Sequence, residues 1–179
     1  MANKLIILDR DGVINYDSKD YIKSPDEWRA IDGSLEAIKK LTTAGFTVIV
    51  ATNQAGIGRG LFSEDSLHAI HTFMQQEIEK AGGKITDIFY CPHHPDDNCK
   101  CRKPKPGMLL EIADKYQIDI NKICMVGDSP KDVAAAKACG AKPKYVLTSI
   151  HHKQLSKDDQ DVPVFSNLLA FVNDFLAGQ

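Results

Sequence analysis

The sequence predicts an α/β protein built on a three-layer, doubly wound and mainly parallel sheet. Short runs of β-branched residues alternate along the chain with longer segments in which apolar residues recur every three or four positions. Each helical segment ends near a glycine or a polar turn. Strands and helices in strict alternation imply parallel strands joined by right-handed helical crossovers, and such sheets bind ligands at the carboxyl ends of their strands.

The predicted elements follow one another in a regular order. The first strand is the apolar run at residues 4–8, and apolar residues at helical spacing predict a helix at 34–44. By the same criteria the later strands are 46–51, 85–90, 123–126 and 144–147, and the later helices are 63–81, 107–116 and 131–139. Residues 151–161 are predicted to form a polar loop, and residues 162–176 a final short strand and a helix.

The composition is that of one folded domain covering residues 1–179, with 43% apolar residues, 26% charged residues and a net charge of −2. Without a strong basic field, nucleic-acid binding is not expected. The longest apolar run, 46–51, is too short to span a membrane. Only four apolar residues separate Lys4 from Asp9, and this stretch is too short for a signal peptide. We therefore expect a cytoplasmic protein whose five cysteines form no disulfide framework.

Two carboxylates stand at the carboxyl end of the first predicted strand, in the run Asp9-Arg10-Asp11-Gly12. Two acids so close repel each other unless a cation lies between them, and Mg²⁺ prefers oxygen ligands of this kind. Gly12 lets the chain turn. The same short motif also occurs in ordinary turns and in calcium loops, so alone it indicates a catalytic site only weakly.

The second predicted strand ends in Thr52-Asn53-Gln54 and leads into a glycine-bearing segment at 55–60. We expect this segment to be a flexible loop whose backbone amides can approach an anion. The Thr52 hydroxyl can donate a hydrogen bond to a phosphoryl oxygen. A simple turn that caps the strand is the alternative interpretation.

Cysteines and histidines cluster after the third predicted strand, as Cys91-Pro-His93-His94 and then Cys99-Lys-Cys101. Four such ligands within a short loop have the spacing of a tetrahedral zinc site. A zinc ion with four protein ligands would be structural and would order a loop that has little core of its own. Spacing alone leaves the choice between His93 and His94 open. Surface thiols beside solvated histidines are the alternative.

Charged residues also follow the zinc loop and the fourth predicted strand. Arg102 and Lys103 come directly after the last cysteine, where a fixed cation can hold a phosphate. Asp128 and Asp132 follow the fourth strand, at the start of a helix that Pro130 favours. Asp128 could be a helix cap, but every candidate falls at the carboxyl end of a predicted parallel strand or in the loop after it.

Taken together, these motifs resemble the four motifs of the haloacid dehalogenase (HAD) superfamily of phosphohydrolases. The matching residues are, in chain order, Asp9-x-Asp11-Gly12, Thr52-Asn53, Lys103 and Gly127-Asp128-x-x-x-Asp132. The finer pattern, which includes the cysteine and histidine loop and the run Cys-x-Cys-Arg-Lys-Pro, resembles the D-glycero-D-manno-heptose-1,7-bisphosphate 7-phosphatase family. The resemblance covers most of the chain and implies a HAD-like Rossmannoid core.

The resemblance also implies a role for each matching residue. Asp9 is expected to be the nucleophile, and Asp11 the general acid and then the general base. Thr52 and Lys103 are expected to stabilise the transferring phosphoryl group. The residues expected to bind the substrate are Asn53, Arg102 and Lys103.

Two metal ions are implied by the same resemblance. A catalytic Mg²⁺ is expected on Asp9, Asp128 and the backbone carbonyl of Asp11, with Asp132 lying behind these ligands. A structural Zn²⁺ is expected on Cys91, His93, Cys99 and Cys101.

The chain departs from the family pattern at two positions and lacks room for one common feature. Val13 stands where a threonine is usual, and Ser129 follows Asp128 where relatives carry lysine, a charge that Lys131 is a candidate to replace. Core elements already fill the intervals in which this superfamily inserts a mobile cap, so no separate cap domain is expected. The loops 17–28 and 53–62 and the zinc loop are then expected to shape an open pocket for a small sugar phosphate.

The expected activity is removal of the 7-phosphate from heptose 1,7-bisphosphate, by a monomer, on the way to the nucleotide-activated heptose of surface glycans. The sequence leaves the preferred anomer open. Histidinol-phosphate phosphatase, which has a similar zinc loop, is the nearest alternative enzyme. A non-catalytic phospho-acceptor or zinc-stabilised binding module is the alternative from another class, although it would have no chemical need for the complete set of motif residues.

Overall fold

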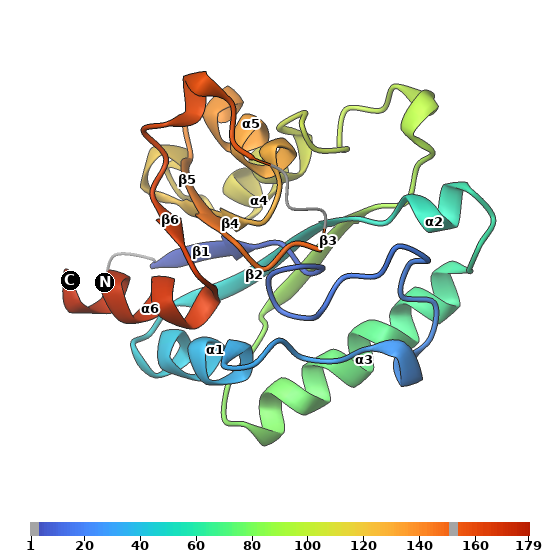
Figure 1. Ribbon diagram of the computed structural model, residues 1–179, viewed down its shortest axis with the longest axis horizontal. Helices are drawn as coiled ribbons and strands as arrows, with labels where there is room; N and C mark the ends of the chain where they lie inside the picture. Colours follow the sequence, from blue (N-terminus) through green and yellow to red (C-terminus); the bar gives the residue numbers. More distant parts are fainter. Residues whose placement is uncertain (1–3, 151–153) are drawn as a thin grey trace.

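The computed structural model describes residues 4–150 and 154–179 and is centred on a six-stranded sheet (Figure 1). All neighbouring strands are parallel, and their order is β3-β2-β1-β4-β5-β6. The strands are β1 Leu5–Leu8, β2 Thr47–Asn53, β3 Asp87–Cys91, β4 Cys124–Gly127, β5 Lys142–Val146 and β6 Val164–Phe165. The predicted doubly wound sheet is therefore confirmed.

Helices cover both faces of this sheet (Figure 1). The helices α1 Ser34–Thr43, α3 Glu64–Lys80 and α6 Leu168–Ala177 lie on one face, and α4 Gly107–Lys115 and α5 Pro130–Cys139 lie on the other. Short 3-10 helices stand in the connections, at Pro25–Glu27, Pro95–Asp97, Ile120–Lys122 and Lys157–Asp159. The predicted strands and helices agree with these bounds to within two residues at either end.

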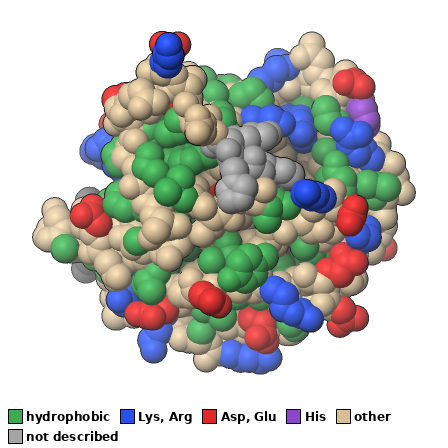
Figure 2. Space-filling model, in the orientation of Figure 1, with side chains coloured by type: hydrophobic (Ala, Val, Ile, Leu, Met, Phe, Trp, Pro, Cys, Tyr) green, Lys and Arg blue, Asp and Glu red, His purple; other side chains and the backbone are tan. Residues whose placement is uncertain are grey.

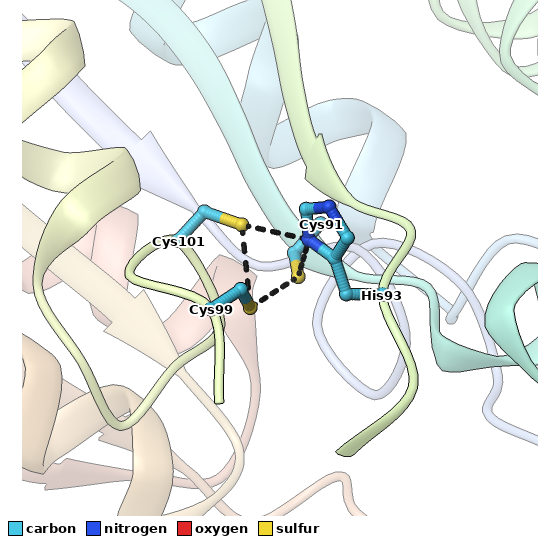
Figure 3. A group of neighbouring side chains, drawn as sticks. All are labelled: Cys91, His93, Cys99 and Cys101. Carbon is cyan, nitrogen blue, oxygen red and sulfur yellow. Dashed lines mark hydrogen bonds between the residues drawn. The ribbon is translucent and has the colours of Figure 1, made fainter. Parts of the chain in front are cut away.

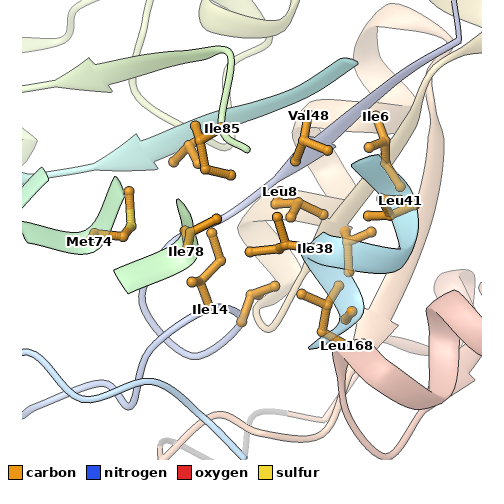
Figure 4. Packing of buried hydrophobic residues seen from close by; sticks show 14 of the residues in the cluster. Ile6, Leu8, Ile14, Ile38, Leu41, Val48, Met74, Ile78, Ile85 and Leu168 are labelled. Carbon is orange, nitrogen blue, oxygen red and sulfur yellow. The ribbon is translucent and has the colours of Figure 1, made fainter. Parts of the chain in front are cut away.

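The apolar strands are buried on both faces because the side chains of each strand alternate between two cores. Ile6 and Leu8 of β1 join the core beneath α1, α3 and α6 (Figure 4), whereas Leu5 and Ile7 join the core beneath α4 and α5. This is why the strands read as continuous apolar runs in the sequence. Full burial of each such side chain contributes about 1.5–3 kcal/mol to stability.

The strand order reverses direction between β1 and β4, with later strands added outward on each side. A crevice forms at the carboxyl ends of the strands at such a point, and ligands bind there. In Figure 1 this end of the sheet is on the right, opposite the two chain termini. In the described part of the chain, the intervals between β1 and β3 contain only elements of the core, so no separate cap domain covers the crevice.

The segment at 55–60 differs from its prediction as a flexible loop. Ala55–Gly58 forms the short helix α2, which packs closely against Phe62 and the zinc loop. A Cβ atom at Gly56 would overlap the Phe62 ring, and one at Gly58 would overlap the backbone at His94. Close packing therefore explains Gly56 and Gly58, whereas Gly60 has a φ of +71°, a conformation that favours glycine.

The predicted polar loop at 151–161 falls partly outside the described residues, which omit 151–153. The part that is described contains the 3-10 helix Lys157–Asp159. No helix among the described residues is both long enough and apolar enough to cross a membrane.

Candidate active site

The first motif lies where β1 ends, and Gly12 is what allows its close packing. Gly12 has a φ of +78°, a conformation that favours glycine, and a Cβ atom at this position would overlap the Asp128 carboxylate. Asp9 follows β1, and Asp128 follows β4, the neighbouring strand. The chain can bring the two carboxylates together only because residue 12 has no side chain.

Asp9, Asp128 and Asp132 form a buried cluster, with one carboxylate oxygen from each within 4.8 Å of the others. Burial and then the charge of Asp132 raise the pKa of Asp9 well above its usual value, and they raise the pKa of Asp128 to about 7. Carboxylates crowded in this way are the donor set that a hard divalent cation prefers, and such a cation would relieve their repulsion. The arrangement therefore fits Mg²⁺.

Lys103 supplies a fixed cation beside this cluster. Its side chain is only 2% exposed, and Nζ lies 3.1 Å from Asp9 Oδ1 and 2.6 Å from Asp132 Oδ1. Nζ also donates a hydrogen bond of 2.8 Å to the Ala51 carbonyl at the end of β2. Burial favours the neutral amine, but Asp132 and Asp9 outweigh it and raise the pKa of Lys103, so the ammonium persists at neutral pH.

Asp132 is in turn held by the start of α5. Its Oδ2 accepts hydrogen bonds from the backbone N–H and the hydroxyl of Ser129, at 3.1 and 3.0 Å. Ser129 thus caps α5 and orients the partner of Lys103. Lys131 lines the cavity described below.

Asp11 is surrounded by hydrogen-bond donors. Its carboxylate accepts from the Arg10 guanidinium at 2.8, 3.0 and 3.1 Å, from Asn15 Nδ2 at 2.9 Å and from Gln54 Nε2 at 3.0 Å. Burial raises the pKa of Asp11, but Arg10 and the two amides outweigh it, so the pKa is lowered. Of these donors, Arg10 could have been suspected from its place between two acids, whereas Asn15 and Gln54 carry no such signal.

The end of β2 contributes Thr52 and Asn53 to the same site. The Thr52 hydroxyl is buried and accepts a hydrogen bond of 3.0 Å from Gln54 Nε2, which leaves its own proton available for a ligand. The Asn53 amide instead makes two hydrogen bonds to the backbone of Lys103, at 2.9 and 3.0 Å. Asn53 therefore borders the cavity while also holding Lys103.

The predicted zinc ligands come together as a four-membered group (Figure 3). Neighbouring ligand atoms in this group, Cys91 Sγ, His93 Nδ1, Cys101 Sγ and Cys99 Sγ, are 3.2–3.5 Å apart. Four ligands about 2.0–2.3 Å from a tetrahedral zinc would be separated by about 3.3–3.8 Å, so these residues fit the ion.

Thiolates are the form that binds zinc, and Cys99 is the thiol best prepared for it. Burial raises the pKa of Cys91 to about 12. Burial would raise the pKa of Cys99 too, but hydrogen bonds from the Arg102 backbone and neighbouring side chains lower it to about 7. The bond to the Arg102 backbone also ties the cysteine cluster to the segment that carries Arg102 and Lys103.

His94, the alternative ligand, is not part of the group of zinc ligands and contacts the backbone after it instead. Its Nδ1 accepts a hydrogen bond of 3.2 Å from the Asp96 backbone N–H, and this bond caps the 3-10 helix Pro95–Asp97. The structure therefore brings His93, and not His94, to the cysteines.

The catalytic candidates line a cavity of about 290 Å³ at the carboxyl ends of the strands. Its lining includes Asp9, Asp11, Thr52, Asn53, Arg102, Lys103, Asp128, Ser129, Lys131 and Asp132, with Asp17, Ser18, Lys19 and Tyr21 from the predicted 17–28 loop. Of the predicted 53–62 loop, only Asn53 is part of this lining. Figure 2 shows basic side chains gathered near this end of the molecule, where Figure 1 places the zinc loop.

Arg102 brings an unsatisfied donor to the cavity. In the part of the chain that the structure describes, its Nη1 atom is buried and has no hydrogen-bond partner. A buried donor without a partner is unfavourable, and an anionic ligand would satisfy it.

A larger cavity of about 570 Å³ lies beside β5 and β6. It is lined mainly by neutral side chains such as Leu147, Leu155 and Val162, and it lacks the paired carboxylates and the lysine of the candidate active site.

The fold and the site define a class of hydrolases that place paired carboxylates and a buried lysine at the carboxyl ends of the strands of a doubly wound α/β sheet. A sequence model of haloacid dehalogenase-like hydrolases matches residues 4–140, and the chain belongs to this family. Its relatives of about 48% identity over most of the chain are named phosphatases, so the chain is a phosphoric monoester hydrolase.

Individual proteins that are similar to this chain carry the same name. D-glycero-beta-D-manno-heptose-1,7-bisphosphate 7-phosphatase of Neisseria meningitidis serogroup A is 48% identical over 172 residues, which cover 94% of this chain and 92% of that protein. The protein of the same name from Bordetella bronchiseptica is 51% identical over 154 residues, 86% of each chain.

A solved structure agrees with these relatives. It is the D,D-heptose 1,7-bisphosphate phosphatase of B. bronchiseptica complexed with magnesium and phosphate, and it superposes with a TM-score of 0.92 at 45% identity over 98% of this chain and 99% of that chain. The resemblance to heptose bisphosphate phosphatases that the sequence predicts is confirmed.

Proposed function

We propose that this protein hydrolyses the 7-phosphate of D-glycero-D-manno-heptose 1,7-bisphosphate by way of a phosphorylated Asp9. The observation that carries the proposal is the placement of Asp9 at the end of β1, 3.1 Å from the buried ammonium of Lys103 and beside Asp128. A buried carboxylate next to a fixed cation and a metal-binding carboxylate is what in-line attack on a phosphate requires. The names of the relatives supply the substrate.

The reaction has two displacements. In the first, an oxygen of Asp9 attacks phosphorus, the bond from phosphorus to the sugar oxygen breaks, and Asp11 gives that oxygen a proton. In the second, water attacks the phosphorus, Asp11 takes a proton from the water, and the bond to Asp9 breaks to release inorganic phosphate. Lys103 and the Thr52 hydroxyl stabilise the charge on the phosphoryl oxygens in both steps.

Asp11 must change its protonation state between the two steps. Arg10, Asn15 and Gln54 favour its ionised form, which is the form that accepts a proton from water. A phosphate dianion beside Asp11 opposes this charge and favours the protonated acid that the first step needs. The donors around Asp11 therefore lower the pKa of its carboxyl group, whereas the bound substrate raises it.

Asp9, Asp128 and the backbone carbonyl of Asp11 would hold Mg²⁺, with Asp132 behind them paired to Lys103. When bound, the ion supplies positive charge that offsets the negative charge of phosphate and carboxylates in the transition state. The magnesium in the related solved structure supports this choice of metal.

Substrate recognition is assigned to Arg102 and Lys131, two cationic residues of the cavity lining. The unpartnered Nη1 of Arg102 supports a role for this residue in binding an anionic group of the sugar phosphate. Lys131 lines the same cavity and provides a second cation, whereas Ser129 is engaged with Asp132. The relatives are named for the beta anomer, and we extend this preference to the present protein.

Zinc at Cys91, His93, Cys99 and Cys101 would be structural, because four protein ligands leave no open position. Its effect would be to order the loop that delivers Arg102 and Lys103 to the site. We further propose that the chain acts as a single domain, as a monomer and in the cytoplasm.

Histidinol phosphate hydrolysis and a non-catalytic binding role are not favoured. The relatives of high identity are named for heptose bisphosphate, and the complete constellation around Asp9 has no purpose in a binding module.

The test is phosphate release, with magnesium, from each anomer of heptose 1,7-bisphosphate, from histidinol phosphate and from a set of common sugar phosphates. We expect the beta heptose bisphosphate to have the highest kcat/KM, and Asp9→Asn to serve as the inactive blank. A clear preference for histidinol phosphate would overturn the substrate while leaving the mechanism in place.

A further inference from the structure

A buried histidine of α3 touches the catalytic loop without facing the cavity. His71 is only 5% exposed, and its Nε2 atom lies 3.1 Å from Nη1 of Arg10, a residue with no exposed surface. Neither side chain is part of the cavity lining. The contact joins residues that are 61 positions apart, so it links α3 directly to the loop after β1.

The chemistry of this contact defines the protonation of His71. A guanidinium group only donates hydrogen bonds, so Nε2 of His71 must be the acceptor and carry no proton. A neutral ring then carries its proton on Nδ1. Burial, followed by the charge of Arg10, lowers the pKa of His71 to about 3, which agrees with a neutral ring at physiological pH.

The other donors of Arg10 are directed at Asp11. Nε donates to Asp11 Oδ1 at 3.0 Å, and Nη2 donates to Oδ1 at 2.8 Å and to Oδ2 at 3.1 Å. A guanidinium is planar and rigid, so a bond at Nη1 fixes the orientation of the edge that faces the carboxylate. His71 therefore limits the rotation of Arg10, and Arg10 limits that of Asp11.

We propose that His71 is a positioning residue that, through Arg10, holds the Asp11 carboxyl group in the orientation needed for proton transfer to the leaving oxygen. This inference rests on the proposed function in so far as Asp11 is the proton donor. General acid catalysis depends on placing the acid within hydrogen-bond distance of the oxygen that departs. His71 contributes to that placement without touching the substrate.

The kinetic test uses leaving groups that differ in their need for a proton. An alkoxide leaving a sugar phosphate requires protonation, whereas nitrophenolate leaves as a stable anion. The value of kcat/KM covers binding and the steps up to formation of phosphorylated Asp9, and among the groups that take part in the chemical step only the need for Asp11 as an acid differs between the two substrates. It is measured for heptose bisphosphate and for p-nitrophenyl phosphate.

Three variants of His71 are compared with a control on the same helix. His71→Leu removes the acceptor, and His71→Asn keeps a polar side chain that is too short to reach Arg10, in case His71→Leu does not fold. His71→Gln places an amide oxygen near the position of Nε2. His68→Leu is the control, because His68 lies one turn earlier on α3, is exposed and contacts the Tyr90 hydroxyl at 3.3 Å.

We expect His71→Leu and His71→Asn to lower kcat/KM for heptose bisphosphate by about tenfold or more, and for p-nitrophenyl phosphate by about threefold or less. His71→Gln should restore most of the loss, and His68→Leu should behave as the wild type. An equal loss on both substrates would mean that His71 only stabilises the fold and would overturn the inference. A wild-type protein inactive on every alkyl phosphate would instead overturn the proposed function, and this inference with it.

The tautomer provides a second test that does not depend on activity. Imidazole ¹⁵N shifts of the wild-type protein at neutral pH should show His71 neutral and protonated on Nδ1. A proton on Nε2, or an imidazolium, would exclude the contact with Arg10 and overturn the inference.

Discussion

The side-chain amide of Asn53 pairs with both backbone groups of Lys103. The Lys103 N–H donates to Asn53 Oδ1 at 3.0 Å, and Asn53 Nδ2 donates to the Lys103 carbonyl at 2.9 Å. With the bond from Lys103 Nζ to the Ala51 carbonyl, the lysine is held to the end of β2 at both its backbone and its side chain. The strand next to β1 therefore determines where the cation beside Asp9 lies.

Replacing Asn53 should loosen Lys103. In Asn53→Ala both hydrogen bonds are lost, and we expect the free energy of unfolding to fall by about 1–2 kcal/mol and kcat to fall about tenfold. Asn53→Asp keeps the acceptor but places a second acceptor against the Lys103 carbonyl, so it should not restore activity. Chemical denaturation and steady-state kinetics check both variants. A rise in KM alone, with stability and kcat unchanged, would show that Asn53 serves only the substrate.

Asp9→Asn should abolish turnover without weakening the fold. The nucleophile is lost, and burial together with Asp132 already disfavours the charge of Asp9 in the absence of metal. We therefore expect the melting temperature without added magnesium to be no lower than that of the wild type. The exposed Asp174→Asn on α6 is the matched control and should remain fully active. Substantial residual activity in Asp9→Asn would remove Asp9 as the nucleophile.

Some of this architecture could be predicted from the sequence because its signals are local. Parallel strands buried on both faces, such as β1 and β2, must be apolar along their whole length, and their ends are where polar residues begin again. The sequence predicts that Asp9 and Asp128 lie close together, because adjacent parallel strands bring their carboxyl ends to the same edge of the sheet.

The remaining contacts depend on how distant segments pack, which no local pattern records. Asn53 with Lys103, and His71 with Arg10, each join residues from different elements through side-chain geometry. The choice between the consecutive residues His93 and His94 could not be made from spacing, because it depends on the direction in which the backbone leaves β3. The helical state of Ala55–Gly58 was missed because two glycines normally disfavour a helix.

Removing one cysteine of the zinc group should lower both stability and activity. In Cys99→Ser the ion is held weakly, and because metal-binding energy is folding energy in such a loop, the free energy of unfolding should fall by about 2 kcal/mol or more. Arg102 and Lys103 should become less ordered, since the Arg102 backbone hydrogen bonds to Cys99. Zinc content by elemental mass spectrometry and thermal unfolding are the measurements.

Cys139→Ser is the matched control for Cys99→Ser. Cys139 lies on α5 and is not part of the zinc group, and within the described residues its Sγ hydrogen bonds only to carbonyls of its own helix. It should therefore keep the zinc content and the melting temperature of the wild type. A Cys99→Ser protein that is as stable and as rich in zinc as this control would contradict the structural zinc site.

Magnesium affinity should increase with pH up to about 7. Burial, followed by Asp132, raises the pKa of Asp128 to about 7 in the metal-free protein, so below this pH the ion must displace a proton from its ligand. The pKa of Asp9, the other carboxylate ligand, is raised as well, so the apparent affinity should rise at least tenfold per pH unit while these ligands release protons, and level off once both are ionised. Because the raised pKa means that the folded metal-free state binds more protons than the unfolded chain, its stability should fall as pH rises from about 4 to about 7. Calorimetric titration of magnesium on both sides of this pKa checks the first trend. An affinity that does not change with pH below 7 would show that Asp128 is already ionised, and Asp128→Asn should weaken the pH dependence and remove most of the binding.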